Sequence, residues 1–135
     1  MVKKLLALGG DGIGPEVLDS GLKILETVSK GIKVKFDIDF DLIGGICWDK
    51  YGTFCRKITI QKAKEVDAIL VGAVGGPKWD AMKIKGDPVD QDGLMCLRKK
   101  LDTFFGIRPI KYYKSLHKIN PFYRKNVQNS EIIVL

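Results

Sequence analysis

Hydrophobic residues follow two different spacings along this chain. Between residues 34 and 42 they alternate strictly with polar residues, which predicts a β-strand with one buried face. Residues 68–71 form a short, continuously apolar run, as expected for a strand that is covered on both faces. Further extended segments are indicated at residues 2–8, 107–113 and 132–135.

Apolar residues at helical spacing separate these extended segments. They predict helices over residues 15–29, 58–66 and 93–105. Residues 82–92 are polar and contain glycine and proline, which indicates a long loop before the third helix. Because strands and helices alternate, the pattern as a whole predicts an α/β fold.

Composition and charge narrow the class of protein. Of the 135 residues, 45% are hydrophobic and 29% charged, which is typical of a globular chain rather than a disordered one. The longest apolar stretch, residues 68–74, is far shorter than the roughly 18 residues that cross a bilayer, and the N-terminus lacks the pattern of a secretory signal. The three cysteines have no CxxC spacing, which favours neither a disulfide framework nor a zinc site. We therefore expect a soluble, cytoplasmic protein with no membrane partner.

The first candidate site is the glycine-rich turn GDGIGPE at residues 10–16, between a predicted strand and a predicted helix. Glycines at the start of a helix let backbone N–H groups approach a phosphate closely. The spacing is one residue short of the G-x-G-x-x-G dinucleotide motif, however, and Pro15 removes one N–H donor. A tight strand-to-helix turn without a ligand explains the glycines equally well.

The second candidate is the segment at residues 72–80, which follows the buried strand and so lies at the carboxyl edge of the predicted sheet. Ligands bind at this edge in open α/β folds. Gly75 and Gly76 permit close approach of the backbone, Lys78 offers a charge to an anion, and Trp79 offers a flat surface. The alternative is a glycine-rich connection with a packed tryptophan.

The third candidate is the predicted helix at residues 93–105. Leu94 and Arg98 are four residues apart and share a face, so one site can contact an alkyl group through Leu94 and a carboxylate through the forked guanidinium of Arg98. Arg108, on the next extended segment, is placed to supply a second guanidinium. The alternative for a helical arginine is simple solvation.

Residues 111–125 alternate aromatic and basic residues, within a chain whose net charge is +7. Such a pattern is compatible with a nucleic-acid surface. No known nucleic-acid-binding motif accompanies it, and a solvated basic connection is the favoured interpretation. We expect no nucleic-acid partner.

Taken in order, the strings GDGIGPEV (10–17), DAILVGAVGGPKWD (67–80), GLMCLRKKLDTFFGIRP (93–109) and EIIVL (131–135) resemble the N-terminal part of the 3-isopropylmalate dehydrogenases. These enzymes belong to the NAD(P)-dependent β-decarboxylating dehydrogenases, together with isocitrate and tartrate dehydrogenases. The GGPKWD string followed by a GLxxLRK helix is more specific to the isopropylmalate branch than GDGIGPE is. The resemblance covers essentially the whole chain.

This resemblance implies an activity, cofactors and partners. The activity is the oxidation of (2R,3S)-3-isopropylmalate by NAD and its decarboxylation to 2-oxo-4-methylpentanoate in leucine biosynthesis. The family uses a divalent Mg or Mn ion and works as a homodimer of two-domain subunits. Alternatives are a tartrate, homoisocitrate or isocitrate dehydrogenase, and a non-catalytic remnant.

The resemblance also assigns residues. It implies that Arg98 and Arg108 hold the substrate carboxylates and that Leu94 faces the isopropyl group. The residues implied to contact the cofactor are Ile13, Gly75, Gly76, Pro77, Lys78, Trp79, Asp80 and Gln91. Two of the family's usual residues are replaced: Gly9 stands in place of a proline, and Gln91 in place of a glutamate.

The resemblance finally implies an incomplete isopropylmalate dehydrogenase-like α/β fold. Residues 1–105 correspond to the N-terminal part of the cofactor-binding domain, and residues 106–135 to the start of a second domain for substrate binding and dimerisation. The catalytic and metal-binding residues of the family are expected beyond Leu135. We therefore expect the chain to be inactive by itself and to contain no metal ligand.

Overall fold

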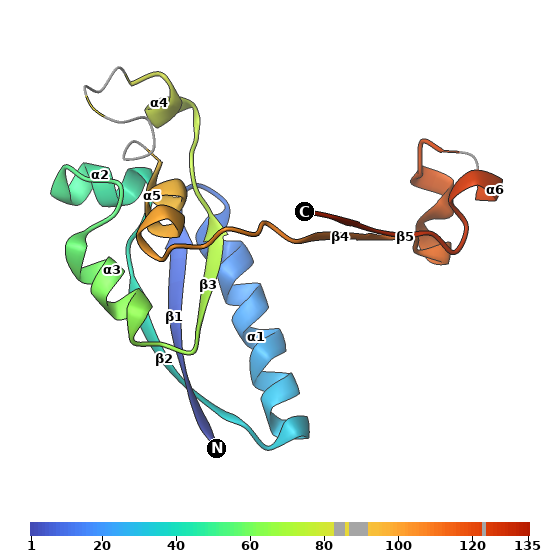
Figure 1. Ribbon diagram of the computed structural model, residues 1–135, viewed down its shortest axis with the longest axis horizontal. Coiled ribbons are helices and arrows are strands. Elements are labelled where there is room, and N and C mark those ends of the chain that lie inside the picture. The colour runs from blue at the N-terminus through green and yellow to red at the C-terminus, as the bar shows by residue number, and fades with distance from the viewer. Residues whose placement is uncertain (83–85, 87–91, 123) are drawn as a thin grey trace. The chain divides into compact units, whose positions relative to one another are not determined.

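The computed structural model describes residues 1–82, 86, 92–122 and 124–135. These residues form two compact units, Met1–Thr103 and Phe104–Leu135 (Figure 1). The division falls two residues before the domain boundary expected from the sequence, and the roles of the two units stay a prediction. No helix of the described residues is long and apolar enough to cross a membrane.

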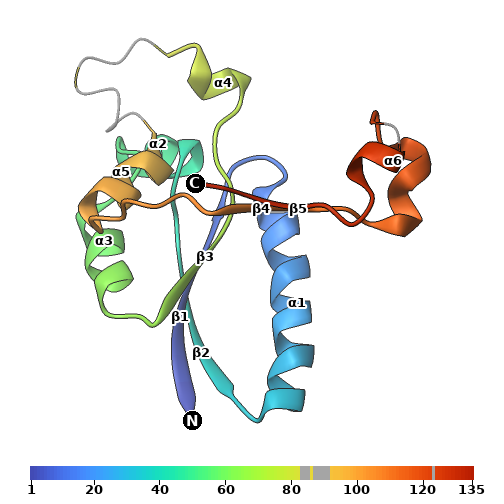
Figure 2. The same cartoon turned by 45° about the vertical axis from the view of Figure 1, so that its right-hand side comes forward.

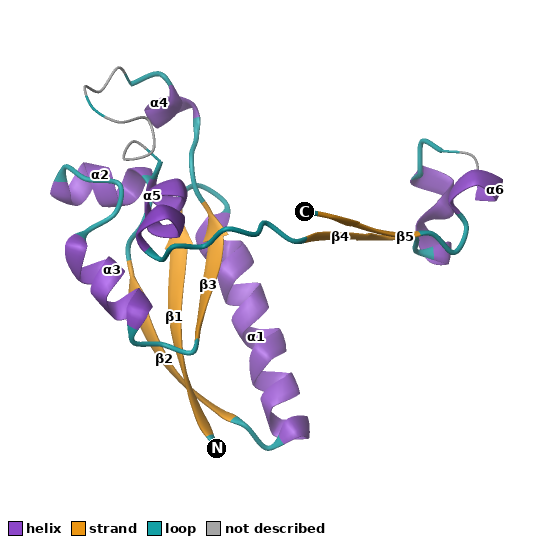
Figure 3. Ribbon diagram, viewed as in Figure 1, coloured by secondary structure: helices purple, strands orange, loops and turns teal. Residues whose placement is uncertain are grey.

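The first unit is built on a three-stranded parallel sheet (Figure 3). Its central strand β1 (Val2–Gly10) lies between β2 (Lys35–Asp41) and β3 (Ala68–Ala73). Leu6 lies opposite Asp39 in β2 and opposite Ile69 in β3. Because all three strands run in the same direction, their carboxyl ends meet at one edge, and the connections that follow them start there.

Helices lie on both sides of this sheet (Figure 2). The long helix α1 (Gly14–Ile32) lies on one side, and α3 (Lys57–Lys64) and α5 (Gly93–Lys100) lie on the other. Two short helices, α2 (Gly45–Tyr51) and α4 (Pro77–Asp80), follow the carboxyl ends of β2 and β3. The α/β fold expected from the sequence is thus confirmed.

The main hydrophobic core lies between the sheet and helices α3 and α5. Its buried members come from the central strand, from the two helices and from the segments between them. They are Leu6, Leu8, Ile43, Cys55, Ala63, Cys96 and Leu97. Leu6, Leu8 and Ile43 have no exposed surface, so the central strand is buried as a parallel strand requires.

The glycine-rich turn after β1 packs directly on the end of β3. The backbone N–H of Asp11 donates to the carbonyl of Ala73 at 2.6 Å. A Cβ atom at Gly14 would overlap the backbone oxygens of Gly9 and Ala73. Glycine is therefore required at position 14 because the two backbones lie too close for a Cβ atom, and no ligand is needed to explain it.

Several elements of the first unit differ from the sequence prediction, among them α2, α5 and β2. Helix α2 was not predicted, because about two turns between glycines are too short to show an apolar period. Helix α5 ends at Lys100 rather than residue 105: Asp102 adopts a left-handed φ of 56°, and the N–H of Thr103 donates to the carbonyl of Arg98 at 3.1 Å. Strand β2 loses its alternation at its end, where Asp41 is buried and Phe40 is 58% exposed.

The second unit contains a two-stranded antiparallel sheet. Strand β4 (Arg108–Lys111) pairs with β5 (Glu131–Val134), and Ile110 lies opposite Ile132. Between the strands the chain forms a 3-10 helix, η2 (Lys114–Ile119), and the short helix α6 (Arg124–Val127), neither of which was predicted.

Candidate functional site

The connections after the three parallel strands converge on the carboxylate of Asp11. This side chain lies in the turn after β1 and is 3% exposed. Its Oδ2 accepts hydrogen bonds from the backbone N–H groups of Gly45 and Gly75, both at 2.8 Å, and its Oδ1 accepts one from Ile46 at 2.7 Å. Asp11 therefore ties the loop after β3 and the first turn of α2 to the turn after β1.

The glycines around Asp11 allowed two interpretations from the sequence, a cradle for an external anion and a tight turn without a ligand. The structure instead places a carboxylate of the chain itself among backbone N–H donors, where it compensates the partial positive charge at the start of α2. Asp11 was not among the predicted site residues. The available signal was an acidic residue between glycines at a strand-to-helix turn, which local spacing cannot distinguish from a solvated aspartate.

A cavity of about 350 Å³ lies beside this cluster. It lies between the glycine segment after β3 and the start of α5, and glycines make up much of its wall. Of the described residues, those that line it are Gly44, Gly45, Phe54, Val74, Gly75, Gly76, Trp79, Asp80, Met82, Asp92 and Gly93. Gly75, Gly76, Trp79 and Asp80 are thus brought together at one cavity.

The segment after Gly76 is held against α2. The indole of Trp79 lies so close to Gly45 that a Cβ atom there would overlap the ring. Asp49, on α2, accepts a hydrogen bond from Lys78 Nζ at 2.6 Å and one from Trp79 Nε1 at 3.2 Å. These bonds, that of Lys78 first, lower the pKa of Asp49 below its usual value. The Lys78 charge that the sequence analysis offered to an anion is therefore paired within the protein.

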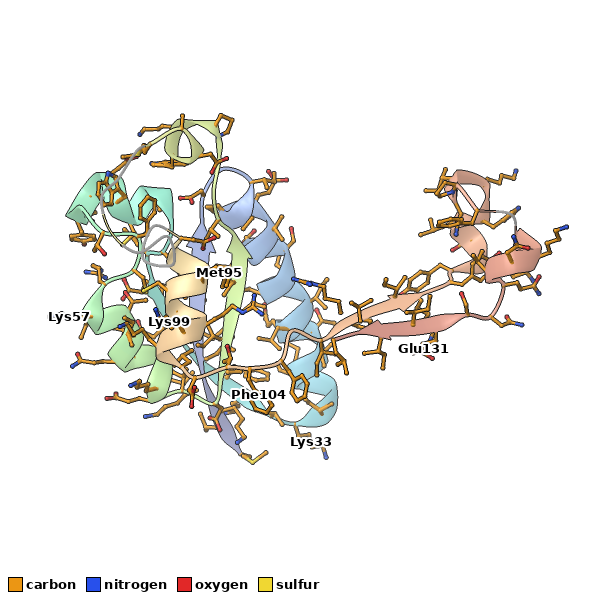
Figure 4. The ribbon with its side chains drawn as sticks, turned by 45° about the horizontal axis from the view of Figure 1, so that its top comes forward. Lys33, Lys57, Met95, Lys99, Phe104 and Glu131 are labelled. Carbon is orange, nitrogen blue, oxygen red and sulfur yellow. The ribbon has the colours of Figure 1, made fainter. Side chains whose placement is uncertain are left out.

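Helix α5 carries two of the predicted substrate residues. Asp92 caps it by accepting hydrogen bonds from the N–H groups of Leu94 at 2.9 Å and Met95 at 3.0 Å. Met95 and Lys99 mark the helix in Figure 4. Leu94 and Arg98 lie one turn apart and are both partly buried, as their spacing predicts. Neither of them lines the cavity.

The remaining predicted residues lie elsewhere. Ile13 is 57% exposed and occupies the N-cap position of α1, two residues after Asp11. Arg108 is exposed at the start of β4, in the second compact unit, so its convergence with Leu94 and Arg98 stays a prediction. Gln91 lies outside the described residues.

The sequence model of the family described as isocitrate/isopropylmalate dehydrogenase matches residues 4–135. The chain belongs to this family. Proteins named 3-isopropylmalate dehydrogenase are similar to it over its whole length: that of Lactococcus lactis is 39% identical over 135 residues, and that of Bacillus subtilis is 38% identical over 135. That of Dehalococcoides mccartyi is 42% identical over 132 residues, or 98% of the chain. The chain spans only 36–37% of the length of these three family members.

Solved structures of the family share this fold. A β-decarboxylating dehydrogenase from Thermococcus kodakarensis matches 98% of the chain with a TM-score of 0.70 at 23% identity. An isocitrate dehydrogenase from Methylococcus capsulatus matches 97% with a TM-score of 0.72 at 20% identity. The chain covers 32% and 33% of these two structures. At such identities the likeness shows the fold, and it agrees with the isopropylmalate dehydrogenase-like fold expected from the sequence.

Proposed function

We propose that this chain supplies part of the substrate and cofactor regions of a cytoplasmic, NAD-dependent 3-isopropylmalate dehydrogenase of leucine biosynthesis. The observation that supports this most strongly is the 39% identity to the Lactococcus lactis 3-isopropylmalate dehydrogenase over all 135 residues. Because the chain spans 37% of that relative, the activity and the homodimeric assembly are proposed for the protein as a whole.

We propose that Arg98 and Leu94 recognise two ends of the substrate. The guanidinium of Arg98 contacts the sulfur of Met95 at 3.9 Å and pairs with no carboxylate of the described residues. It is therefore available to a substrate carboxylate, which suits a bidentate guanidinium. Leu94, one turn earlier, presents a branched alkyl surface to an isopropyl group. Arg108 is proposed to hold a second carboxylate.

We propose that the cofactor contacts Ile13, the segment 75–80 and Gln91, of which Gln91 lies outside the described residues. The glycine-lined cavity fits this role, since it lets a ligand approach the backbone closely. When bound, NAD accepts the hydride from the carbinol carbon of the substrate. In this arrangement Trp79 and Gly76 form the wall, and Lys78 shapes the segment through Asp49 rather than through a free charge.

A divalent metal is implied by the family, but the described residues do not supply its site. No three His, Cys, Asp or Glu side chains among them are grouped to hold a metal ion. We therefore assign no metal ligand and derive no step through the metal.

A chimera tests the proposed function. Residues 1–135 replace the matching third of the Lactococcus lactis relative, and NADH formation is followed by its absorbance with isopropylmalate, isocitrate or tartrate as substrate and with Mn present. Turnover of isopropylmalate is expected, with weaker turnover of the other two acids. A preference for isocitrate or tartrate would contradict the proposal.

Two substitutions in the chimera separate the roles of the substrate residues. Leu94→Ser is expected to lower kcat/KM for isopropylmalate roughly tenfold, since burial of a branched alkyl group is worth about 1–3 kcal/mol. Arg98→Ala is expected to cost about 100-fold or more, as loss of a charge-assisted bidentate contact does. The matched controls are Ile24→Ser, on exposed α1 surface, and Lys100→Ala, on α5. Equal effects of the variants and their controls would count against these roles.

A further inference from the structure

The segment 75–80 is held at both ends by carboxylates that the family resemblance did not single out. At its start, the N–H of Gly75 donates to Asp11 Oδ2 at 2.8 Å. Near its end, Lys78 and Trp79 donate to the two oxygens of Asp49 at 2.6 and 3.2 Å. Both aspartates also connect the segment to α2: Asp49 lies on this helix, and Asp11 accepts hydrogen bonds from the N–H groups of Gly45 and Ile46 at its start.

The same contacts define the wall of the cavity. Gly45 and Gly75, which Asp11 binds, and Trp79, which Asp49 binds, all line it. Gly75 and Gly76 adopt positive φ values of 96° and 156°. Because glycine has no Cβ atom, this backbone has many accessible conformations when it is not restrained. A glycine segment that must become ordered when a ligand binds lowers the affinity, whereas one already ordered by the protein does not.

We propose that Asp11 and Asp49 are positioning residues that fix the segment 75–80 against α2 and so preform the wall of the nucleotide cavity. This rests on the proposed function only for the identity of the nucleotide. Neither aspartate needs to touch the ligand: Asp11 is 3% exposed and all its contacts given above are to backbone N–H groups. The arrangement also explains why Lys78 is paired, since its charge secures the segment.

The first experiment measures the restraint itself, without nucleotide. Amide hydrogen exchange of Gly45, Ile46 and Gly75 is followed by NMR, in the purified wild-type chain and in the Asp11→Asn variant. The three amides are expected to be protected in the wild-type chain and to exchange at least tenfold faster in the variant, while amides of β1 change little. If these amides are as unprotected in the wild-type chain as exposed loop amides, the proposal is overturned, and this result does not require the variant to fold.

The second experiment measures the consequence for binding. NADH affinity of the chimera described above is determined by calorimetry for the unsubstituted form, for Asp49→Ala and for the control Asp39→Ala. The control removes another partly exposed aspartate–lysine pair (Asp39–Lys62, 2.8 Å), whose residues do not line the cavity. Asp49→Ala is expected to raise the Kd for NADH by about threefold to tenfold and to speed exchange of the Trp79 indole N–H, and Asp39→Ala to do neither.

The outcomes separate this inference from the proposed function. Faster Trp79 exchange with an unchanged Kd would overturn the positioning role. If the unsubstituted chimera binds no NADH, the assignment of the cavity to the nucleotide fails. In that case the restraint is still supported if the amides of Gly45, Ile46 and Gly75 are protected in the wild-type chain and exchange faster in Asp11→Asn. It is overturned if these amides are unprotected in the wild-type chain.

Discussion

Asp41 is a charged residue whose side chain is almost completely buried, with 2% exposure. It pairs with the guanidinium of Arg56, and its Oδ2 accepts a hydrogen bond from Thr59 at 3.0 Å. Its Oδ1 also accepts from the N–H of Leu42 at 2.7 Å. The guanidinium of Arg56 in turn lies 4.3 Å from the ring centre of Tyr51. A buried carboxylate is tolerated because each of its oxygens has a partner.

The first prediction concerns this pair. Arg56→Ala leaves the Asp41 carboxylate buried without its counter-charge. The variant is expected to lower the free energy of unfolding by about 2 kcal/mol. This loss is smaller than that for a fully buried pair, because Arg56 is partly exposed. Urea denaturation measures it. The double variant Arg56→Ala/Asp41→Asn is expected to recover part of the loss. As a control, Lys30→Ala removes an exposed helix pair and is expected to have little effect. If Lys30→Ala and Arg56→Ala lowered the free energy of unfolding equally, a special role of the buried pair would be refuted.

The second prediction concerns the thiols. Burial, followed by the nearby Cys96 and Cys47, raises the pKa of Cys55 from 9.0 to about 12. Because the pKa is higher in the folded chain, the contribution of this thiol to stability is complete below pH 9 and is lost as the pH rises towards about 12. Cys55→Ala is therefore expected to flatten the decline of stability in this range.

Folded chain at pH 8 is expected to resist iodoacetamide at Cys55, and rapid labelling without denaturant would disprove the burial.

At the scale of elements, α5 links the cavity to the proposed substrate residues. Its N-cap residue Asp92 and its first residue Gly93 line the cavity, and Leu94 and Arg98 follow in its first and second turns. The direction of the helix is set at its start, where the side chain of Asp92 accepts from two N–H groups, and at its end, where Asp102 turns the chain away. The apolar spacing predicted the helix itself, but Phe104 and Phe105, counted as helical in the prediction, lie after this turn.

The third prediction tests the cap of α5. Asp92→Ala leaves the N–H groups of Leu94 and Met95 without their acceptor and is expected to lower the free energy of unfolding by about 1 kcal/mol. Asp92→Asn, which keeps an oxygen acceptor, is expected to lose less. Thermal unfolding followed by circular dichroism measures both. An alanine variant as stable as wild type would show that α5 does not depend on this cap.

At the scale of the whole molecule, the two units differ in how their strands are buried. Leu6, Ala7 and Leu8 in β1 have no exposed surface, and β1 is paired on both sides. All residues of β4 and β5 are exposed, and each of these strands has one partner. Two-stranded sheets are marginally stable by themselves.

The fourth prediction follows from this difference. Hydrogen exchange of the full chain is expected to be slowest at the amides of Leu6, Ala7 and Leu8 and at least 100-fold faster at those of β4 and β5, because local opening costs least where few apolar contacts are lost. Uniformly low protection would show instead that the first unit does not fold stably without further chain.

The sequence by itself determined the local elements and the family. Period-two alternation identifies β2, apolar runs identify β1 and β3, and helical spacing identifies α1, α3 and α5. The strings around Gly75 and Arg98 carry the family resemblance. Such patterns are local: each needs only the residues of one segment and its flanks.

Only the tertiary structure decided where the charged residues go. The alternation places Asp41 on the polar face of its strand, and the sequence offers Lys78 to an anion. In the structure Asp11 and Asp41 are buried and Lys78 is paired within the chain. Their partners are distant in the sequence: Asp11 binds Gly75, 64 residues away, and Lys78 binds Asp49, 29 residues away. The environment of a charge depends on which donors the folded chain brings to it, and a local pattern contains no information on partners so far along the chain.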